Sequence, residues 1–213
     1  MILHTVPGSP NGRKVEAVIF HLGLDVEIRH HDLFTGELRG SDYLAINPNA
    51  KAPTLVDGDF KLWESAAIMQ YLADKAGENT LFPRNPRSRA DITRWQSWQG
   101  LYFNAALGTL AFETIAKPRH NAGPPDTALV EQACATLSRF SPVLDAHMDG
   151  RKYLVNDQLT LADYSMAAFE PYVNLVPFNF APYRHIHTYF GRMRQSEHWL
   201  RTGKPAASRS IAA

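Results

Sequence analysis

The feature that most constrains the fold of this chain is a change of pattern near residue 77. Before it, short apolar runs alternate with helical patterns in the order strand, helix, strand, hairpin, helix. A stretch at 77–87, with Asn and Pro residues typical of a linker, separates that part from a mostly helical remainder. We therefore predict a small α/β domain at 1–76, a linker at 77–87 and an all-helical domain at 88–213.

Local start and stop signals place the elements of the first domain. Gly23 is expected to end a helix, and Asp57-Gly58 is a turn dipeptide between two short apolar runs. Strands are predicted at 2–6, 25–30, 54–56 and 60–62, and helices at 11–23 and 65–75.

The remainder of the chain carries helical patterns. Pro142 lies inside one of them and is expected to kink or split that helix. Helices are predicted at 89–112, 126–149 and 183–195, and a further helix opens within "LTLADYSMAAF" at 159–169.

Composition excludes several classes of function. A net charge of +1 over 213 residues gives no electrostatic basis for binding nucleic acid. Cys134 is the single cysteine, which excludes an internal disulfide and a CxxC redox centre. We see no signal peptide, and no window approaches the roughly 20 apolar residues of a membrane helix. These features predict a cytoplasmic globular protein. We also expect no metal cofactor.

The stretch "GSPNGRKV" stands at the first predicted helix start. Ser, Pro, Asn and Gly are ordinary turn residues, so it is a turn signal in its own right. A helix start also carries unpaired N–H groups and a partial positive charge, which stabilise an anion such as a thiolate. A hydroxyl or amide donor from Ser9 or Asn11 would lower the pKa of a thiol there. Because no cysteine lies nearby, that thiol would have to belong to a ligand.

A second stretch, "NPNAKAPTLVDGDFKLWESAAI" at 47–68, offers partners for the rest of such a ligand. Ala52-Pro53 precedes a strand, and a cis bond there would expose the backbone of Ala52 to an extended ligand. Ser65 begins a helix, where its hydroxyl and N–H could hold a carboxylate. Lys51 supplies a cation close by. As structural features alone, these are a surface lysine, a turn proline and a helix cap.

Together with "LTLADYSMAAF", these stretches resemble the glutathione S-transferase family over nearly the whole chain. The resemblance implies a thioredoxin-like N-terminal domain, an all-α C-terminal domain and glutathione as co-substrate. The third motif resembles the buried capping box of that family, with Thr160 at the cap and Asp163 three residues later.

The resemblance also implies roles for single residues in holding glutathione. Pro53 would be a cis proline, and Ala52 would pair its backbone with the cysteinyl part. Glu64 would face the γ-glutamyl amine and Ser65 its carboxylate. Lys51 or Arg39 would face the glycyl carboxylate, because position 38 holds Leu instead of the His found in some classes.

Two class signatures meet at the first turn. Ser9 aligns with the serine of theta-like enzymes, and Asn11 with the asparagine of nu-like bacterial enzymes, which are associated with disulfide reduction. The resemblance thus implies a glutathione transferase with Ser9 as donor and Asn11 as second donor. A nu-like disulfide reductase is the first alternative, and a non-catalytic interaction protein of the same fold is the second. Gly12 would let the backbone approach closely, while Arg13 would either pair within the domain or favour the anion.

The electrophile pocket is expected between the first turn and the helical domain. Its predicted residues are Tyr102, Phe103, Asn104, Leu107, Tyr164 and Phe178. The family is usually homodimeric. Phe60 and Trp63, if exposed, would fit such an interface, but both could equally be buried within one subunit. The partners implied are glutathione and a small hydrophobic electrophile or a disulfide.

Overall fold

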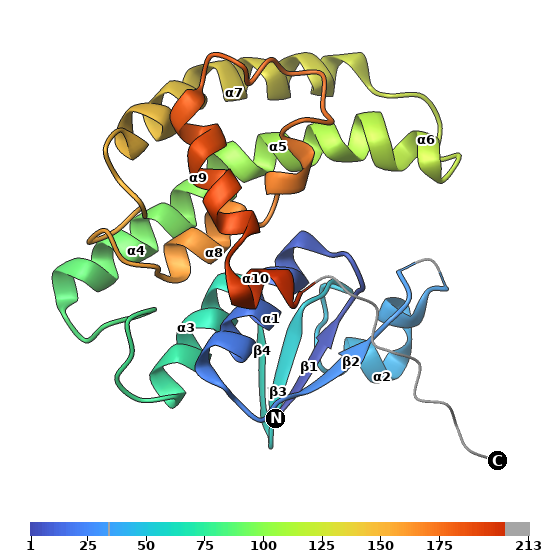
Figure 1. The fold of residues 1–213 in the computed structure, drawn as a ribbon. Helices are drawn as coiled ribbons and strands as arrows, with labels where there is room; N and C mark the ends of the chain where they lie inside the picture. The colour runs from blue at the N-terminus through green and yellow to red at the C-terminus, as the bar shows by residue number, and fades with distance from the viewer. Residues whose placement is uncertain (34, 203–213) are drawn as a thin grey trace. The chain divides into compact units, whose positions relative to one another are not determined.

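The computed structural model describes residues 1–33 and 35–202. The chain divides into two compact units, each described here by itself (Figure 1). Unit 1 comprises Met1–Gly77 together with the segment from Gln195 onward, and unit 2 comprises Glu78–Arg194. Within the described ranges, no helix is both long and apolar enough to cross a membrane.

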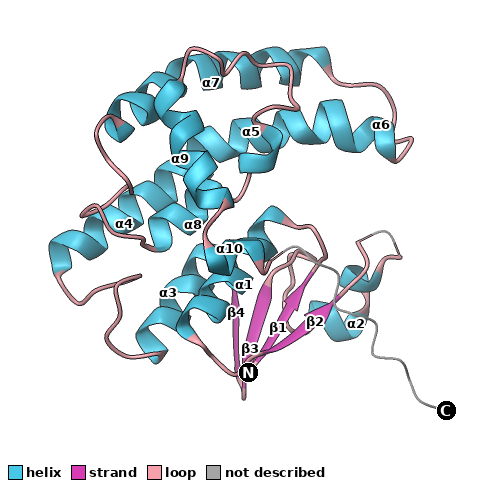
Figure 2. Cartoon of the chain, in the orientation of Figure 1, coloured by secondary structure: helices cyan, strands magenta, loops and turns pink. Residues whose placement is uncertain are grey.

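Unit 1 is built on a four-stranded sheet (Figure 2). The strands are β1 (Ile2–Thr5), β2 (Glu27–His30), β3 (Thr54–Asp57) and β4 (Phe60–Trp63). Their spatial order is β2-β1-β3-β4, in which β1 pairs parallel with β2 and antiparallel with β3. The β3–β4 hairpin confirms the turn at Asp57-Gly58. This mixed sheet and its helices make the thioredoxin-like arrangement that was predicted.

Two helices pack beside each other in unit 1: α1 (Pro10–Leu22) and α3 (Ser65–Lys75). Helix α1 ends as predicted, because Gly23 takes a left-handed conformation with φ of 62°. The apolar faces of both helices are fully buried, with Val15 and Val18 on α1 and Ile68 and Leu72 on α3. A 3-10 turn, η1 (Glu37–Arg39), and a short helix, α2 (Ser41–Leu44), were not predicted.

Unit 2 begins with a long helical stretch that is less regular than expected. Helices α4 (Pro86–Trp98) and α5 (Asn104–Ala111) are joined by a π-helical turn, η2 (Gln99–Phe103). A second π turn, η3 (Phe112–Ala116), leads into α6 (Lys117–Arg119). The single helix predicted at 89–112 is therefore interrupted in its middle. Such π turns are rare and frequently mark functional sites.

The remaining helices are α7 (Thr127–Met148), α8 (Leu161–Ala167), α9 (Arg184–Arg194) and α10 (Glu197–Leu200), with a 3-10 turn η4 (Glu170–Tyr172). Pro142 lies inside α7 and does not split it. Ser138, whose carbonyl loses its helical partner at a proline four residues later, is exposed, as is Pro142. Water can therefore satisfy that carbonyl, which makes the proline tolerable.

Helix α8 begins with the predicted capping box. The Asp163 carboxylate accepts from the backbone N–H groups of Thr160 (2.8 Å) and Leu154 (2.9 Å), and from the Tyr189 hydroxyl (3.1 Å). Thr160, Asp163 and Tyr189 are all buried. Burial raises the pKa of Asp163 to about 6, against the opposing effect of these hydrogen bonds.

The segment after α9 differs from the sequence-based domain boundaries, which assigned all of 88–213 to the helical domain. Residues from Gln195 to Thr202 group with unit 1. Trp199 of α10 is fully buried, and α10 packs on α1. The last part of the predicted domain, residues 203–213, lies outside the described residues.

Candidate functional site

The first turn of α1 holds the two predicted thiolate donors. Ser9 is the N-cap of α1, and its hydroxyl oxygen accepts a hydrogen bond from the Gly12 backbone N–H at 3.3 Å. A serine hydroxyl has one donor hydrogen and two acceptor positions, so this cap leaves the hydrogen able to point at a ligand. Ser9 is half-buried. The side chain can therefore serve as a helix cap and as a donor at once.

Gly12 allows a close approach between the first turn and strand β1. A Cβ atom at this position would overlap the Thr5 hydroxyl oxygen. Thr5 is fully buried, and its hydroxyl has no hydrogen-bond partner among the described residues. Gly12, which was predicted to allow a close approach of the backbone, therefore makes room for the Thr5 side chain of strand β1.

Asn11 links the starts of α1 and α3. The Ser65 hydroxyl donates to the Asn11 carboxamide oxygen at 3.5 Å, the long limit of a hydrogen bond. Ser65 is buried and is the first residue of α3. The residue predicted to bind the γ-glutamyl carboxylate is therefore adjacent to one of the two predicted thiolate donors.

The start of α3 is open to an anion. Its N-cap is Glu64, which makes no side-chain capping hydrogen bond. Glu64 has φ of 70° and ψ of 110°, a conformation that side-chain-bearing residues rarely adopt. Because the first N–H groups of a helix lack intrahelical acceptors, they can donate hydrogen bonds to a negatively charged group of a ligand here. The Glu64 side chain is exposed and free to meet a ligand cation.

A buried lysine accompanies this start and was not singled out from the sequence. Lys14 on α1 is only 3% exposed. Burial lowers its pKa to about 8, and the nearby Glu64 carboxylate opposes that shift. Lys14 lies four residues before Val18 and thus on the apolar face of α1, which is the sequence signal that could have identified it.

The peptide bond between Ala52 and Pro53 is cis, as predicted. The loop before it is fixed through the Lys51 carbonyl, which accepts from the Tyr43 hydroxyl (2.8 Å) and the Asn47 carboxamide (2.7 Å). Both side chains are buried, whereas the Lys51 side chain is exposed. Tyr43 and Asn47 thus position the loop, and a sequence reading misses them because they resemble ordinary loop residues.

The second predicted cation, Arg39, is exposed on η1, next to the buried Leu38. Lys51 and Arg39 therefore both present their charge to solvent within unit 1. The choice between them for the glycyl carboxylate stays a prediction.

A histidine pair lies under the loop that leads to η1. The ring nitrogens of His4 on β1 and His31 after β2 are 2.8 Å apart, and Nδ1 of His31 lies 3.3 Å from the Glu37 carboxylate. The Tyr43 ring lies edge-on to both imidazoles. Burial, with His31 adding to it, lowers the pKa of His4 to about 4. His4 is therefore neutral at pH 7.

Four of the six predicted pocket residues lie in the interior of unit 2. Phe103, Leu107 and Tyr164 are 0% exposed, and Asn104 is 3% exposed. The Asn104 carboxamide donates to the carbonyl of Ser165 at 2.9 Å and so joins two helices. These residues pack in the interior of unit 2, and their role as substrate contacts stays a prediction. Long apolar side chains at helical spacing are more often core than binding surface.

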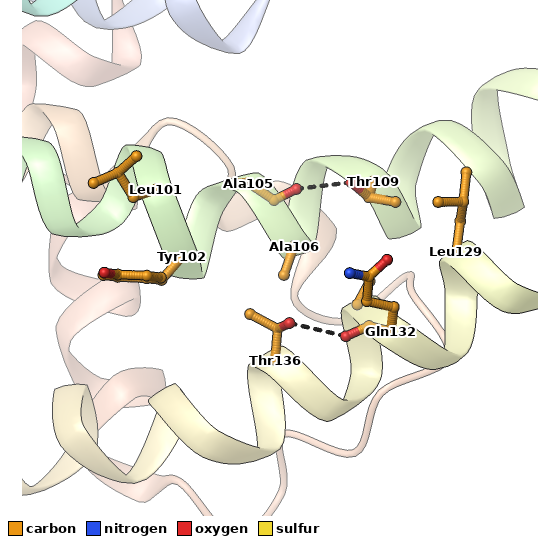
Figure 3. A pocket seen from close by; sticks show the side chains of 9 residues that line it. Leu101, Tyr102, Ala105, Ala106, Thr109, Leu129, Gln132 and Thr136 are labelled. Carbon is orange, nitrogen blue, oxygen red and sulfur yellow. Dashed lines mark hydrogen bonds between the residues drawn. The ribbon is translucent and has the colours of Figure 1, made fainter.

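The other two predicted pocket residues remain accessible. Tyr102 is 39% exposed and lines a hollow of about 210 Å³ between α5 and α7. Figure 3 shows its ring beside Leu101, with Gln132 and Thr136 on the facing helix. Phe178 is half-buried and packs on Phe180, with their ring centroids 4.7 Å apart. Neither is tested as a substrate contact by this geometry.

In the part of the chain that the structure describes, no three His, Cys, Asp or Glu side chains lie close enough to hold a metal ion. The starts of α1 and α3 in unit 1 offer hydroxyl, amide and backbone donors. Such donors suit a ligand with a thiolate and a carboxylate.

Two protein-family models match the sequence of this chain. Residues 3–80 match the model of the glutathione S-transferase N-terminal domain, and residues 103–197 match that of the C-terminal domain. Glutathione S-transferase 3 of Zea mays is 39% identical over 166 residues, which cover 78% of this chain and 74% of that protein.

Solved structures show the same fold. Glutathione transferase F2 of Populus trichocarpa superposes with a TM-score of 0.85 at 25% identity, covering 93% of this chain and 95% of that one. The glutathione-bound theta class glutathione S-transferase of Xanthomonas axonopodis pv. citri gives a TM-score of 0.84 at 25% identity, covering 96% and 97%.

Proposed function

Because this chain belongs to the glutathione S-transferase family, we propose that it is an enzyme that binds glutathione in unit 1 and activates its thiol. The bound thiolate attacks the electrophilic atom of a small hydrophobic substrate. The new S–C bond forms with the sulfur electron pair, the leaving group departs with its own pair, and the thiol proton passes to solvent.

The observation that carries this proposal is the pairing of two helix starts through Asn11 and Ser65. Glutathione carries a carboxylate at its γ-glutamyl end and a thiol in its middle. One open helix start, at Ser65, suits the carboxylate, and the other, capped by Ser9, suits the thiolate. The two are joined within one unit, as a single ligand requires.

The other predicted residues are assigned to the parts of glutathione in order, from the γ-glutamyl end to the glycyl end. Glu64 holds the γ-glutamyl amine, and the backbone of Ala52 before Pro53 pairs with the cysteinyl part. Lys51 or Arg39 meets the glycyl carboxylate. The buried Lys14 balances the charge of Glu64 from within the domain.

We favour Ser9 over Asn11 as the principal thiolate donor. The contact with Ser65 uses the carboxamide oxygen of Asn11, and this contact supports a role for Asn11 near the γ-glutamyl end of the ligand. The Ser9 hydroxyl keeps its hydrogen, because its contact with Gly12 uses an acceptor position only. Hydrogen bonding to the charged form lowers a pKa.

The test is the ultraviolet thiolate band of bound glutathione, titrated against pH in the wild type and in Ser9→Ala. We expect the wild type to hold the thiol pKa below its free value, and Ser9→Ala to raise it by about one unit, a tenfold effect on the thiolate equilibrium. An unshifted pKa in the wild type would falsify the mechanism. A rise in the Asn11→Ala variant alone would transfer the role to Asn11.

Disulfide reduction with glutathione is the second candidate, and the presence of Asn11 at the first turn favours it. Cys134 lies on α7, and its thiol donates to the carbonyl of Pro177 at 3.6 Å. Both thiols of such a reaction would therefore come from glutathione. If the protein reduces a model disulfide but does not conjugate a standard dinitrobenzene substrate, disulfide reduction becomes the first candidate function and conjugation the second.

The proposal includes a cytoplasmic homodimer. Phe60 and Trp63 on the edge strand β4 are 45% and 41% exposed, and Leu101 beside the hollow in unit 2 is 68% exposed. Exposed apolar side chains of this size are typical of interfaces. Sedimentation analysis decides the oligomeric state, and a single species of monomer mass would remove this part of the proposal.

A further inference from the structure

The guanidinium of Arg13 is directed to the C-terminal segment of unit 1. Its Nε donates to the Thr202 hydroxyl at 2.7 Å, and its Nη2 donates to the Trp199 carbonyl at 3.4 Å. The guanidinium carbon lies 4.0 Å from the centroid of the Trp199 ring, within the range of a cation–π contact. Arg13 is thus held at three points by residues nearly 190 positions later.

The acceptor side of this contact is itself fixed. The Thr202 hydroxyl, which accepts from Arg13, donates to the Trp199 carbonyl at 2.6 Å. Trp199 is fully buried, and Thr202 is 5% exposed. A buried hydrogen-bonded chain of this kind resists displacement, because breaking it leaves polar groups without partners.

The backbone of Arg13 belongs to the same turn as the proposed thiolate donor. Its N–H donates to the Ser9 carbonyl at 2.9 Å, which closes the first turn of α1. One residue therefore joins the turn that carries Ser9 and Asn11 to the segment from Ser196 to Thr202. The C-terminal segment touches α1 at its other end as well, where Arg201 lies 4.5 Å from the centroid of the Phe20 ring.

Resting on the proposed function, we propose that Arg13 is a positioning residue through which the segment from Ser196 to Thr202 holds the Ser9 hydroxyl in place for the glutathione thiolate. Arg13 acts through the geometry of the first turn, since its guanidinium is engaged by Trp199 and Thr202. A donor must lie within a fraction of an ångström of its productive position to stabilise a developing charge. The C-terminal segment supplies that precision.

The experiment compares two disruptive variants with a matched control. Arg13→Gln removes the cation, and Thr202→Val removes the acceptor while keeping the side-chain shape. Arg201→Gln removes the other arginine–aromatic contact between α1 and the C-terminal segment, at the end of α1 distant from Ser9. For each variant, the thiol pKa of bound glutathione, kcat, KM for glutathione and the melting temperature are measured.

We expect Arg13→Gln and Thr202→Val to raise the thiol pKa by about half a unit to one unit, a threefold to tenfold loss of thiolate. The value of kcat falls with it near neutral pH, while KM for glutathione changes less than twofold. Arg201→Gln lowers the melting temperature without moving the thiol pKa. A wild-type pKa in folded Thr202→Val protein overturns the inference, and so does an equal shift in Arg201→Gln.

A measurement without glutathione separates this inference from the proposed function. Amide hydrogen exchange at Arg13, whose N–H bonds to Ser9, is expected to be at least threefold faster in Thr202→Val than in Arg201→Gln. If the wild type shows no thiol shift, the proposed function fails while this difference still supports the positioning role. Equal exchange in the two variants rejects the positioning role whatever the thiol does.

Discussion

The start of α8 and the start of α1 use the same kind of residue for opposite purposes. At α8, Thr160 and Asp163 are buried, and the carboxylate satisfies donors from the backbone and from Tyr189. At α1, Ser9 is half-buried, and its hydroxyl keeps its hydrogen after capping the helix. A capping motif whose donors and acceptors are all used inside the protein stabilises the fold. One that keeps a donor at the surface is available to a ligand.

The starts of α1 and α8 also differ in how they are supported. The α8 box is supported within unit 2 by Leu154, nine residues before Asp163, and by Tyr189, 26 residues after it. The first turn of α1 depends on Thr5 beneath it, on Ser65 beside it and on the C-terminal segment. A ligand site thus draws on more distant parts of the chain than a structural cap does.

The largest expected effect on stability is at the start of α8. Asp163→Ala leaves buried donors of Thr160 and Leu154 without acceptors, and we expect a loss of about 3–5 kcal/mol in the free energy of unfolding. Asp126→Ala is the control, because Asp126 caps α7 with two backbone bonds but is exposed. That change should cost about 1 kcal/mol. Urea denaturation measures both, and equal losses would refute the contrast between a buried box and a surface cap.

The second largest expected effect concerns the close approach of Gly12 to Thr5 at the start of α1. Gly12→Ala forces the Thr5 hydroxyl aside, and we expect a loss of about 1–3 kcal/mol. Gly191→Ala in α9 meets nothing within 4 Å and should stabilise the protein by about 0.5–1 kcal/mol.

A double-mutant cycle with Thr5→Ala isolates the contact at Gly12. Because Thr5→Ala removes the overlapping oxygen, the losses of the two single variants should sum to more than the loss of the double variant, by about 1 kcal/mol. Additive losses would show that the Thr5 hydroxyl is not what excludes a side chain at Gly12.

The smallest effect is a pH dependence with opposite signs in the two units. His4 has its folded pKa lowered from 6.5 to about 4, so its contribution to stability is present above pH 6.5 and is lost as the pH falls toward 4. Asp163 has its folded pKa raised from 3.8 to about 6. Its contribution to the free energy of unfolding therefore falls as the pH rises from 3.8 to about 6.

Removing His4 should therefore reveal the effect of Asp163. We expect His4→Phe to flatten the acid-side loss by about 1–2 kcal/mol between pH 6.5 and 4, leaving stability that declines as the pH rises. Thermal unfolding at half-unit steps of pH measures this. A variant with the same profile as the wild type would remove His4 as the source.

Sequence reasoning succeeded wherever the signal is local. Helix α3 runs from Ser65 to Lys75 as predicted, α1 ends at Gly23, and the hairpin turns at Asp57-Gly58. Capping boxes, glycine stops and turn dipeptides act within a few residues, so the chain itself carries the information.

It failed wherever the outcome depends on distant packing. No local sequence signal near residue 99 predicts the π turn. The buried position of Asn104 goes with its hydrogen bond to the carbonyl of Ser165, 61 residues later. Trp199 contacts Arg13 of α1, which lies 186 positions earlier in the chain. Of the predicted site, the pairing of Asn11 with Ser65 emerges only from the structure, because it requires α1 and α3 to pack side by side.

The return of the C-terminal segment has a consequence for synthesis of the protein on the ribosome. Unit 1 consists of Met1–Gly77 and residues from Gln195 onward, with all of unit 2 translated between them. At about 5–20 residues per second, a nascent chain needs roughly 6–24 s to add the intervening segment. During that time the surface of α1 that Trp199 later covers is without its partner. Synthesis of unit 1 therefore begins before that of unit 2 and is completed only after it.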